Sequence, residues 1–513
     1  MTTDATTASH RPLEGGQLWL AAVLLAAANF IAVLDMTIAN VSVPDIAGSL
    51  GISSSQGTWV ITSYSVAEAC VVPLTGWIAG RFGAVRVFST AMVLFGICSL
   101  LCGLSPTLGL LVAGRVLQGL SGGSLMPLSQ TLLLRIFPKE KAGSAMALWA
   151  MTTLVAPVLG PILGGFICDV YAWPLIFFIN VPIALVVAPI AYRLLSRYET
   201  ALERKPIDRV GLVLLIVFVS ALQLMLDLGK EKDWFASNLI VMLGVVALIG
   251  FAAFLIWELT EQHPIVDLRV FRHRGFAVGV MTIAMGFGAI FAANVLTPLW
   301  LQTYMGYTSN WAGRTTAWSG VLAVAASPIA GKLAARTDPR RLVCFGLAWL
   351  GGVMILRTIG TTQMGYWEIS MPLLLMGIGM PFFFVPLTSL SLGSVRPEET
   401  ASAAGLQNFM RTLSGAVATS LVTTSWENRT DAIHADLVGS LDAAGDVARA
   451  LHGLGFGRDA TNAVLDQLLT GQSVMLATNQ ILWIVAVIFL GAALAIWLAP
   501  RPTRAVSMSE AGH

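Results

Sequence analysis

A series of apolar windows, each about 20 residues long, recurs along almost the whole chain and constrains its fold more than any other feature. Because about 20 helical residues cross a hydrocarbon core about 30 Å thick, each window predicts one membrane-spanning helix. Only 11% of the residues are charged, whereas about a quarter are charged in ordinary soluble domains. The sequence therefore predicts an all-α integral membrane protein.

Fourteen such windows are separated by Gly, Pro or charged residues. They cover residues 18–43, 58–79, 87–104, 108–134, 142–167, 174–195, 210–226, 237–257, 277–302, 312–335, 342–359, 369–392, 401–424 and 475–499. Lys and Arg accumulate on the cytoplasmic side of membrane proteins, and 21 of the 30 fall in inner loops or tails if the N-terminus lies inside. The charge pattern therefore fits fourteen spans with two cytoplasmic tails, residues 1–17 and 500–513.

Composition and missing motifs exclude several functional classes. A net charge of +2 argues against a nucleic-acid-binding protein. The five cysteines form no CxxC pair and the histidines do not cluster, so we predict no metal site. There is no phosphate-binding Gly-rich loop of the P-loop type, no nucleophile elbow and no haem motif. The sequence thus predicts neither an enzyme nor a cofactor, and the energy for any transport would come from a proton gradient.

An internal repeat divides the chain. Residues 73–81 match residues 328–336 at Pro, Gly, Ala and Arg with a constant offset of 255, and residues 127–140 match 386–399 at an offset of 259. Two six-helix halves of the same orientation, 18–197 and 259–499, therefore flank two inserted helices at 198–258. Parallel halves imply a central cavity that opens alternately to each side. The repeated turns carry the candidate gating residues Gly76, Arg81, Gly83, Arg86, Gly331, Arg336 and Arg341.

Three charged residues lie at one depth within the first half. Asp35 is inside the first span, Glu68 is in the middle of the second and Arg115 is inside the fourth, followed by Gln118 and Gly119. A carboxylate at that depth costs about 2.5 to 3.5 kcal/mol, which is tolerated if it faces a wet cavity. We predict that Asp35 exchanges protons, that Glu68 relays a proton or holds a cationic substrate, and that Arg115 pairs with a carboxylate. Packing carboxylates and a static ion pair are the alternatives.

Other polar and small residues are weaker candidates. Gly160, Pro161 and Gly164 combine a proline kink with small faces that allow close helix packing. In the second half, Asn408 and Arg411 have either a cavity role or a structural one. The candidate cavity residues also include Asn29, Asn180, Asn294 and Gln302.

A polar segment of about 50 residues, 425–474, separates the last two spans. Its apolar residues recur at helical spacing, so we predict short amphipathic helices outside the membrane. This periplasmic loop is either a solvated cap or a docking surface for a periplasmic partner.

Several motifs resemble those of one transporter family. They are Leu34-Asp-Met-Thr-Ile-Ala-Asn-Val41, Ser55-Gln-Gly-Thr-Trp-Val-Ile-Thr-Ser63, Arg115-Val-Leu-Gln-Gly119, Gly160-Pro161, Phe177-Phe-Ile-Asn-Val-Pro182 and Asn408-Phe-Met-Arg411-Thr412. The chain resembles the major facilitator superfamily, in particular its fourteen-helix drug:proton antiporters of the EmrB type, which implies the 6+2+6 major facilitator fold. By that resemblance Asp35 is the proton-linked acid, Arg115 the coupling arginine and the Gly160 helix the antiporter signature.

The resemblance also implies partners. The loop 425–474 is similar to the loop in pumps that join a periplasmic adaptor, an EmrA-type membrane fusion protein, and through it an outer-membrane channel. Two residues depart from the family pattern. Gly80 stands where Asp is usual, so the charge latch of the first turn is incomplete or supplied elsewhere, and Glu68 stands where a neutral polar residue is expected.

The sequence therefore predicts a multi-pass protein of the bacterial inner membrane that exports small lipophilic toxic compounds in exchange for protons. Two alternatives stay open: an exporter of one endogenous metabolite or fatty acid, and a membrane sensor or assembly protein that moves no solute. Charged residues at cavity depth favour transport, because a sensor needs no proton site there.

Overall fold

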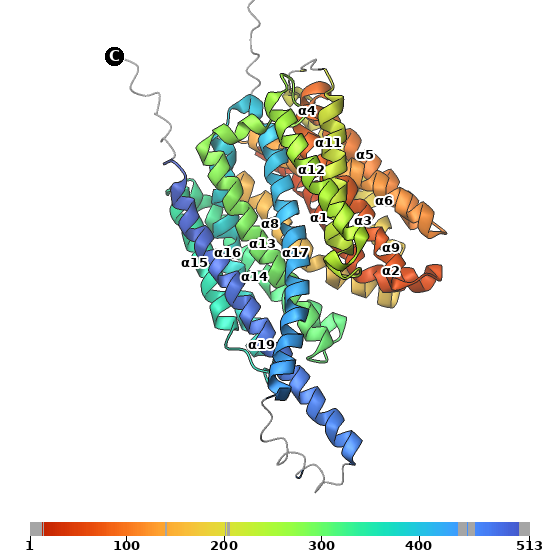
Figure 1. Ribbon diagram of the computed structural model, residues 1–513. Helices are drawn as coiled ribbons and strands as arrows, with labels where there is room; N and C mark the ends of the chain where they lie inside the picture. Colours follow the sequence, from red (N-terminus) through yellow and green to blue (C-terminus); the bar gives the residue numbers. More distant parts are fainter. Residues whose placement is uncertain are drawn as a thin grey trace, which may run out of the picture.

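The computed structural model describes residues 13, 15–138, 141–200, 202, 206–439, 449 and 457–501, and within these ranges the regular elements are all helices (Figure 1). The predicted tails 1–17 and 500–513 therefore lie mostly outside the described residues, as does the middle of the loop 425–474.

Eleven of the described helical segments are long and apolar enough to cross a membrane. They are α1 (Gly15–Leu50), α5 (Ala84–Gly103), α8 (Ala142–Val170), α9 with α10 (Leu175–Phe178 and Asn180–Leu195), α11 (Arg209–Leu228), α12 (Asn238–Thr260), α13 (Arg274–Thr303), α14 (Ser309–Ala334), α15 (Pro339–Arg357), α16 (Tyr366–Gly393) and α19 (Arg458–Ala495). This number is compatible with fourteen spans, and the exact count stays a prediction.

The other three predicted spans are interrupted or more polar. The second consists of α3 (Trp59–Val71), a 3-10 turn and α4 (Thr75–Phe82), with Pro73 in the turn. Proline has no N–H to donate, so the regular helix is interrupted there. The fourth is divided into α6 (Leu108–Gly122) and α7 (Leu125–Ile136), and the thirteenth is α17 (Thr400–Gly439).

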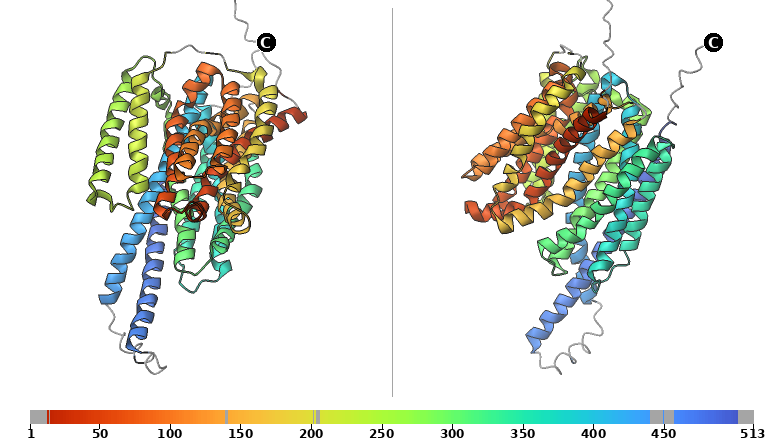
Figure 2. Two further views of the ribbon diagram at one scale, coloured as in Figure 1. Left: turned by 90° about the vertical axis from the view of Figure 1, so that its right-hand side faces the viewer. Right: turned by 180° about the vertical axis from the view of Figure 1, so that it is seen from behind.

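Helices of each predicted half pack mainly on one another. In the first half α1 lies against α8, α10 and α7, and in the second α16 lies between α14 and α15. The inserted helices α11 and α12 pack together, and α11 also contacts α3 (Figure 2). The residue boundaries of these units stay predictions.

The halves meet along α8 with α14 and along α4, α7 and α17. Gly76 on α4 lies so close to α17 that an added Cβ would overlap Ser402, and a Cβ on Gly331 of α14 would overlap Ala147 and Gly143 of α8. These glycines thus allow close approach between the halves. We expected tight turns at Gly76 and Gly331, which was wrong, because both glycines lie inside helices. The candidate gating glycine with a positive φ is Gly83, at +92°.

The segment 425–474 differs from the prediction of short separate helices. Its described residues continue α17 to Gly439 and begin α19 at Arg458. These two long helices extend past the rest of the bundle, at the end of the molecule opposite to the one where α19 ends at Ala495 (Figure 1). Trp426 Nε1 donates to Thr478 Oγ1 at 2.9 Å and ties the two together. The predicted helical conformation was correct for the described residues, but they extend the membrane-spanning helices α17 and α19 and do not form separate short helices.

Candidate functional site

An enclosed ion pair forms the centre of the first half. Arg115 NH1 on α6 donates to Asp35 Oδ2 on α1 at 2.6 Å, and both side chains have no exposed surface. Removing both charges from water is costly, so the pair is stable only with good geometry and further hydrogen bonds. The sequence expectation that Arg115 pairs with a carboxylate is met by Asp35.

Neutral amides complete the coordination of Asp35. Gln118 Nε2 and Asn180 Nδ2 donate to Asp35 Oδ1 at 2.9 and 2.7 Å. The same two amide groups lie 2.7 and 3.0 Å from Ser99 Oγ on α5. Helices α1, α6 and α10 therefore meet at one carboxylate, and α5 joins the same network through Ser99. Asn180, predicted as a cavity residue, is instead a direct partner of Asp35, while Ser99 was missed because a serine in an apolar span gives no distinctive signal.

The Arg115 side chain also contacts groups other than the Asp35 carboxylate. Its Nε donates to the Val60 carbonyl at 2.9 Å, and its guanidinium carbon lies 4.2 Å from the Tyr64 ring centroid. Its NH2 is buried without a hydrogen-bond partner among the described residues. Asp35 is 1% exposed, so in this structure the acid is closed off, whereas we expected it to face a wet cavity. Proton exchange at Asp35 therefore requires another conformation or a rearrangement of its partners.

A second buried arginine lies where the halves meet. Arg411 on α17 is 6% exposed, and its NH2 contacts the Met126 sulfur on α7 across the interface. Its guanidinium carbon is 5.9 Å from the Trp149 ring centroid and 5.4 Å from that of Phe287. No described carboxylate lies within 4.0 Å of it, and its NH1 is buried without a hydrogen-bond partner. Arg411 is thus surrounded by soft and aromatic groups.

Glu68, on α3 of the second predicted span, is also buried. It is 3% exposed, and its Oε2 has no hydrogen-bond partner in the described residues. Among the described residues, Glu68 forms no ion pair with Arg115 or Arg411.

Further polar groups extend this interface region. Asn408 Nδ2 donates to Gln130 Oε1 at 2.8 Å, which links α17 to α7. Asn29 Nδ2 donates to Thr152 and Thr153 Oγ1 at 2.8 and 2.7 Å on α8. Gln130 Nε2 and Asn29 Oδ1 are buried without partners among the described residues. The structure thus brings together buried polar atoms from both halves that retain hydrogen-bonding capacity.

The remaining candidates have other positions. On α8, a Cβ on Gly160 would overlap Thr37, and Gly164 lies against Ile38, so this helix packs closely on α1 beside Asp35; Pro161 lies inside the same helix. Gly119 lies equally close to α3. Asn294 is half-buried on α13, and Gln302 is exposed near the end of that helix, away from both arginines.

The first charged turn has an acid that the sequence did not reveal. The Glu199 carboxylate, just after the sixth predicted span, accepts from the backbone N–H of Val85 and Arg86 at 2.9 and 3.1 Å and lies 3.9 Å from Arg86 Nε. A Cβ on Gly83 would overlap this carboxylate. Glu199 therefore supplies a negative charge at the turn in which Gly80 replaces Asp.

In the second turn, the fixed arginine is not one of those predicted. The predicted residues Arg336 and Arg341 are exposed, whereas Arg340 is buried. The Arg340 guanidinium donates to the Asp338 carboxylate at 2.8 Å and to the Ala499 carbonyl at 3.1 Å. The hydrogen bond from the Arg340 side chain lowers the pKa of Asp338. The two repeats thus form different charge contacts.

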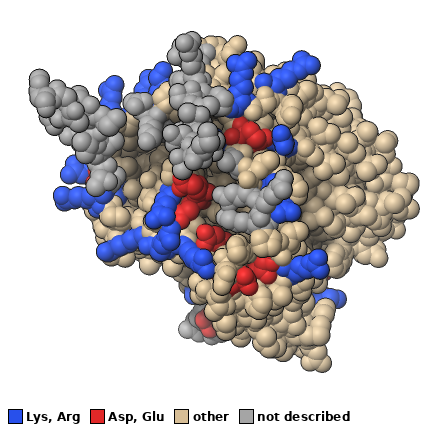
Figure 3. Space-filling view, turned by 90° about the horizontal axis from the view of Figure 1, so that it is seen from above, with Lys and Arg blue, Asp and Glu red and all other residues tan. Residues whose placement is uncertain are grey.

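The end of the molecule with these turns is rich in basic side chains. Figure 3 shows Lys and Arg distributed over this face and its rim, with a smaller acidic group between them. Among the described residues, no group of three or more His, Cys, Asp or Glu could hold a metal ion.

Residues 25–419 match the sequence profile described as Major Facilitator Superfamily. The chain is 44% identical to the Multidrug export protein EmrB of Escherichia coli K12, over 96% of this chain and 97% of that protein. It is 43% identical to the Fatty acid resistance protein FarB of Neisseria gonorrhoeae, over 96% and 98%. The human organic anion transporter MFSD10 has a similar fold, with a TM-score of 0.57, 13% identity and coverage of 94% of this chain and all of that one.

Proposed function

The chain belongs to the Major Facilitator Superfamily, and on that premise we propose that it exports lipophilic toxic compounds in exchange for protons. The expected family and fold are confirmed, and the chain is a multi-pass membrane protein. Full-length similarity to a multidrug export protein supports drug efflux. The observation that carries the proton-coupling proposal is the enclosed Asp35–Arg115 pair.

The geometry suggests how a proton acts. Protonation of Asp35 removes the charge that holds Arg115 and converts an acceptor for three donors into a neutral group. The contacts that join α1 to α6 and α10 are then weakened, which favours a different arrangement of the first half. Substrate that binds between the halves competes with this state, and the halves rock. A gradient supplies about 2.3 kcal/mol per charge per 100 mV.

The orientation and partners form a further part of the proposal. The basic face would lie in the cytoplasm by the positive-inside rule, with the chain in the bacterial inner membrane. The extension of α17 and α19 would then project into the periplasm, where an adaptor of the EmrA type that connects to an outer-membrane channel would bind. Shortening this extension should abolish co-purification with the adaptor, and undiminished co-purification would contradict the docking role.

One observation favours a second candidate. Arg411 offers a buried cation without a carboxylate among the described residues within 4.0 Å, which suits a substrate acid, and one relative is named for fatty acid resistance. Export of a fatty acid or of one endogenous metabolite is therefore the alternative.

The test is transport of a panel of lipophilic dyes, including rhodamine 6G and ethidium, in proteoliposomes with an imposed pH gradient. We expect gradient-dependent movement by the native chain and its loss in Asp35→Asn. Asp45→Asn, on the same helix but exposed, is the matched control and should transport normally. Movement of a long-chain fatty acid without any dye would favour the alternative, and undiminished dye export by Asp35→Asn would contradict proton coupling through Asp35.

A further inference from the structure

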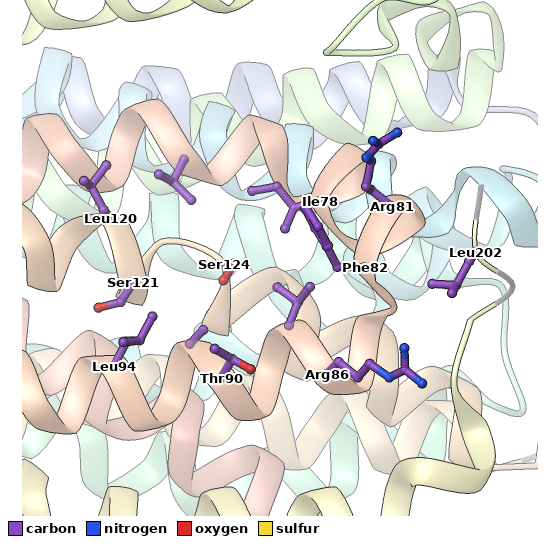
Figure 4. A pocket seen from close by; sticks show the side chains of 13 residues that line it. Ile78, Arg81, Phe82, Arg86, Thr90, Leu94, Leu120, Ser121, Ser124 and Leu202 are labelled. Atoms are coloured by element: carbon purple, nitrogen blue, oxygen red, sulfur yellow. The ribbon is translucent and has the colours of Figure 1, made fainter. Parts of the chain in front are cut away.

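An open groove of about 640 Å³ lies on the flank of the first half, away from both buried arginines (Figure 4). It is formed by the end of α3, by α4 and α5, by the end of α6, by Ser124 between α6 and α7, and by Leu202. Its walls are mostly apolar, with Phe82, Leu94 and Leu120 exposed by 54%, 46% and 46%. In a membrane such side chains face lipid, so the groove opens to the bilayer and not to the space between the halves.

The groove is polar at one end. Arg81 and Arg86 lie on opposite walls of the groove at the end near Leu202, whereas Leu94, Leu120 and Ser121 lie at the other end (Figure 4). Along α5, Arg86 and Leu94 are eight residues apart, so the apolar part continues for about 12 Å from the charged end. The shape suits an amphiphile with an anionic head and a chain that lies along the helices.

The position of the charged end also suits this ligand. Arg81 is in the last turn of α4 and Arg86 in the first turn of α5, and α4 lies at the end of the molecule that carries the basic face (Figures 1 and 3). Basic side chains at such helix ends are expected at the level of the lipid headgroups. Arg86 has a side chain that is 59% exposed and only a long contact of 3.9 Å to Glu199, so its guanidinium is accessible to a headgroup phosphate. Guanidinium binds phosphate through two parallel hydrogen bonds, and basic side chains at this depth attract anionic lipids.

We propose that this groove binds one anionic phospholipid of the adjacent leaflet, with its headgroup phosphate on Arg81 and Arg86 and an acyl chain against Phe82, Leu94 and Leu120. A zwitterionic lipid has the same chain but no net negative charge, so its binding is weaker. This site requires only the membrane-spanning fold, and it is independent of what the transporter carries.

The experiment reconstitutes the full chain in vesicles of three parts phosphatidylethanolamine to one part phosphatidylglycerol and counts retained lipids by native mass spectrometry. We expect one retained phosphatidylglycerol. In Arg81→Gln/Arg86→Gln the preference for phosphatidylglycerol over phosphatidylethanolamine should fall by about 10- to 30-fold, because each basic side chain contributes to the attraction.

Two further variants keep the test decisive. Arg336→Gln/Arg341→Gln removes the equivalent charges of the second repeat, which do not line the groove, and should keep the native preference. Thr90→Phe fills the groove while both arginines remain, and should lose the bound lipid even if the double variant does not fold. Equal retention of both lipids by the native chain, or an equal loss in both arginine pairs, would overturn the proposal.

Discussion

Two arginines are buried at the centre of this molecule, and their surroundings are opposite in kind. Arg115 has an anion at 2.6 Å, a carbonyl at 2.9 Å and a ring centroid at 4.2 Å. Arg411 has a sulfur contact and two aromatic rings, and no described carboxylate lies within 4.0 Å of it. Arg115 lies within one half, whereas Arg411 lies where the halves meet.

The comparison separates two tasks. A cation that is paired with a carboxylate holds helices together, and changing the charge of that carboxylate alters their arrangement. A buried cation without a carboxylate among the described residues within 4.0 Å can pair with the charge of a ligand, at a cost in stability. We therefore propose that the Asp35–Arg115 pair responds to protons and that the Arg411 region recognises the ligand.

The largest effect should follow removal of the anion from the first site. Asp35→Ala leaves Arg115 buried without its partner and removes the acceptor for Gln118 and Asn180, so the free energy of unfolding should fall by about 3 to 5 kcal/mol. Thermal unfolding in detergent measures this, with Asp45→Ala as the control. A loss no larger than that of the control would show that the pair does not stabilise the fold.

A smaller loss should follow a change of shape at constant charge. Arg115→Lys keeps the cation but cannot replace both the Nε bond to Val60 and the NH1 bond to Asp35. We expect a loss of about 1 to 3 kcal/mol in the same assay. Wild-type stability in this variant would mean that the positive charge alone stabilises the site and that the planar guanidinium group of Arg115 is not needed.

At Arg411, a substitution should raise the free energy of unfolding, whereas the two substitutions at the Asp35–Arg115 pair lower it. Arg411→Met removes a buried cation that forms no ion pair with any described residue, and leaves an apolar side chain beside Met126 and Trp149. The free energy of unfolding should rise by about 1 kcal/mol while export falls. The transport assay is the second readout. A destabilisation as large as that of Asp35→Ala would remove the distinction between the two arginines.

The smallest effect concerns an ion pair at the surface. Burial raises the pKa of Glu399, but hydrogen bonds from the Arg396 backbone N–H and from His273, with the charge of Arg272, lower it more, so the net pKa is below its usual value. A carboxyl group whose pKa is lowered in the folded state stabilises the folded protein above its unfolded pKa of about 4.3, and this stabilisation is lost as the pH falls through the folded pKa.

Glu399→Gln should therefore cost about 0.2 to 1 kcal/mol near neutral pH, because Arg272 is half-exposed, and nothing at low pH. Thermal unfolding as a function of pH measures the difference between variant and native chain. A difference that persists unchanged at low pH would contradict the assignment to the charge of Glu399.

Much of this arrangement follows from the sequence. Hydropathy gave the helices because lipid requires long apolar runs, and unusual charges such as Asp35 and Arg115 stand out in them. Ser99 does not stand out, and Glu199 lies in an ordinary polar segment, so neither could be selected. The sequence also does not reveal that Asn180 donates to Asp35, because the relative rotation of the helices is set by packing between distant segments.

The repeat illustrates the same limit. The matched glycines predicted equivalent turns, but Gly76 and Gly331 are contact points between halves, and the local acids differ, with Glu199 in one repeat and Asp338 in the other. Sequence identity at an offset shows common architecture. It does not show which neighbouring side chain completes each charge contact.

The central claim is that a proton and a substrate compete through Asp35. The most direct measurement is the proton released when the best transported dye of the panel binds to the detergent-solubilised protein in a weakly buffered solution, followed with a pH indicator. The account predicts that the native chain and Asp45→Asn release protons on binding and that Asp35→Asn binds dye without release. Full proton release by Asp35→Asn would contradict it.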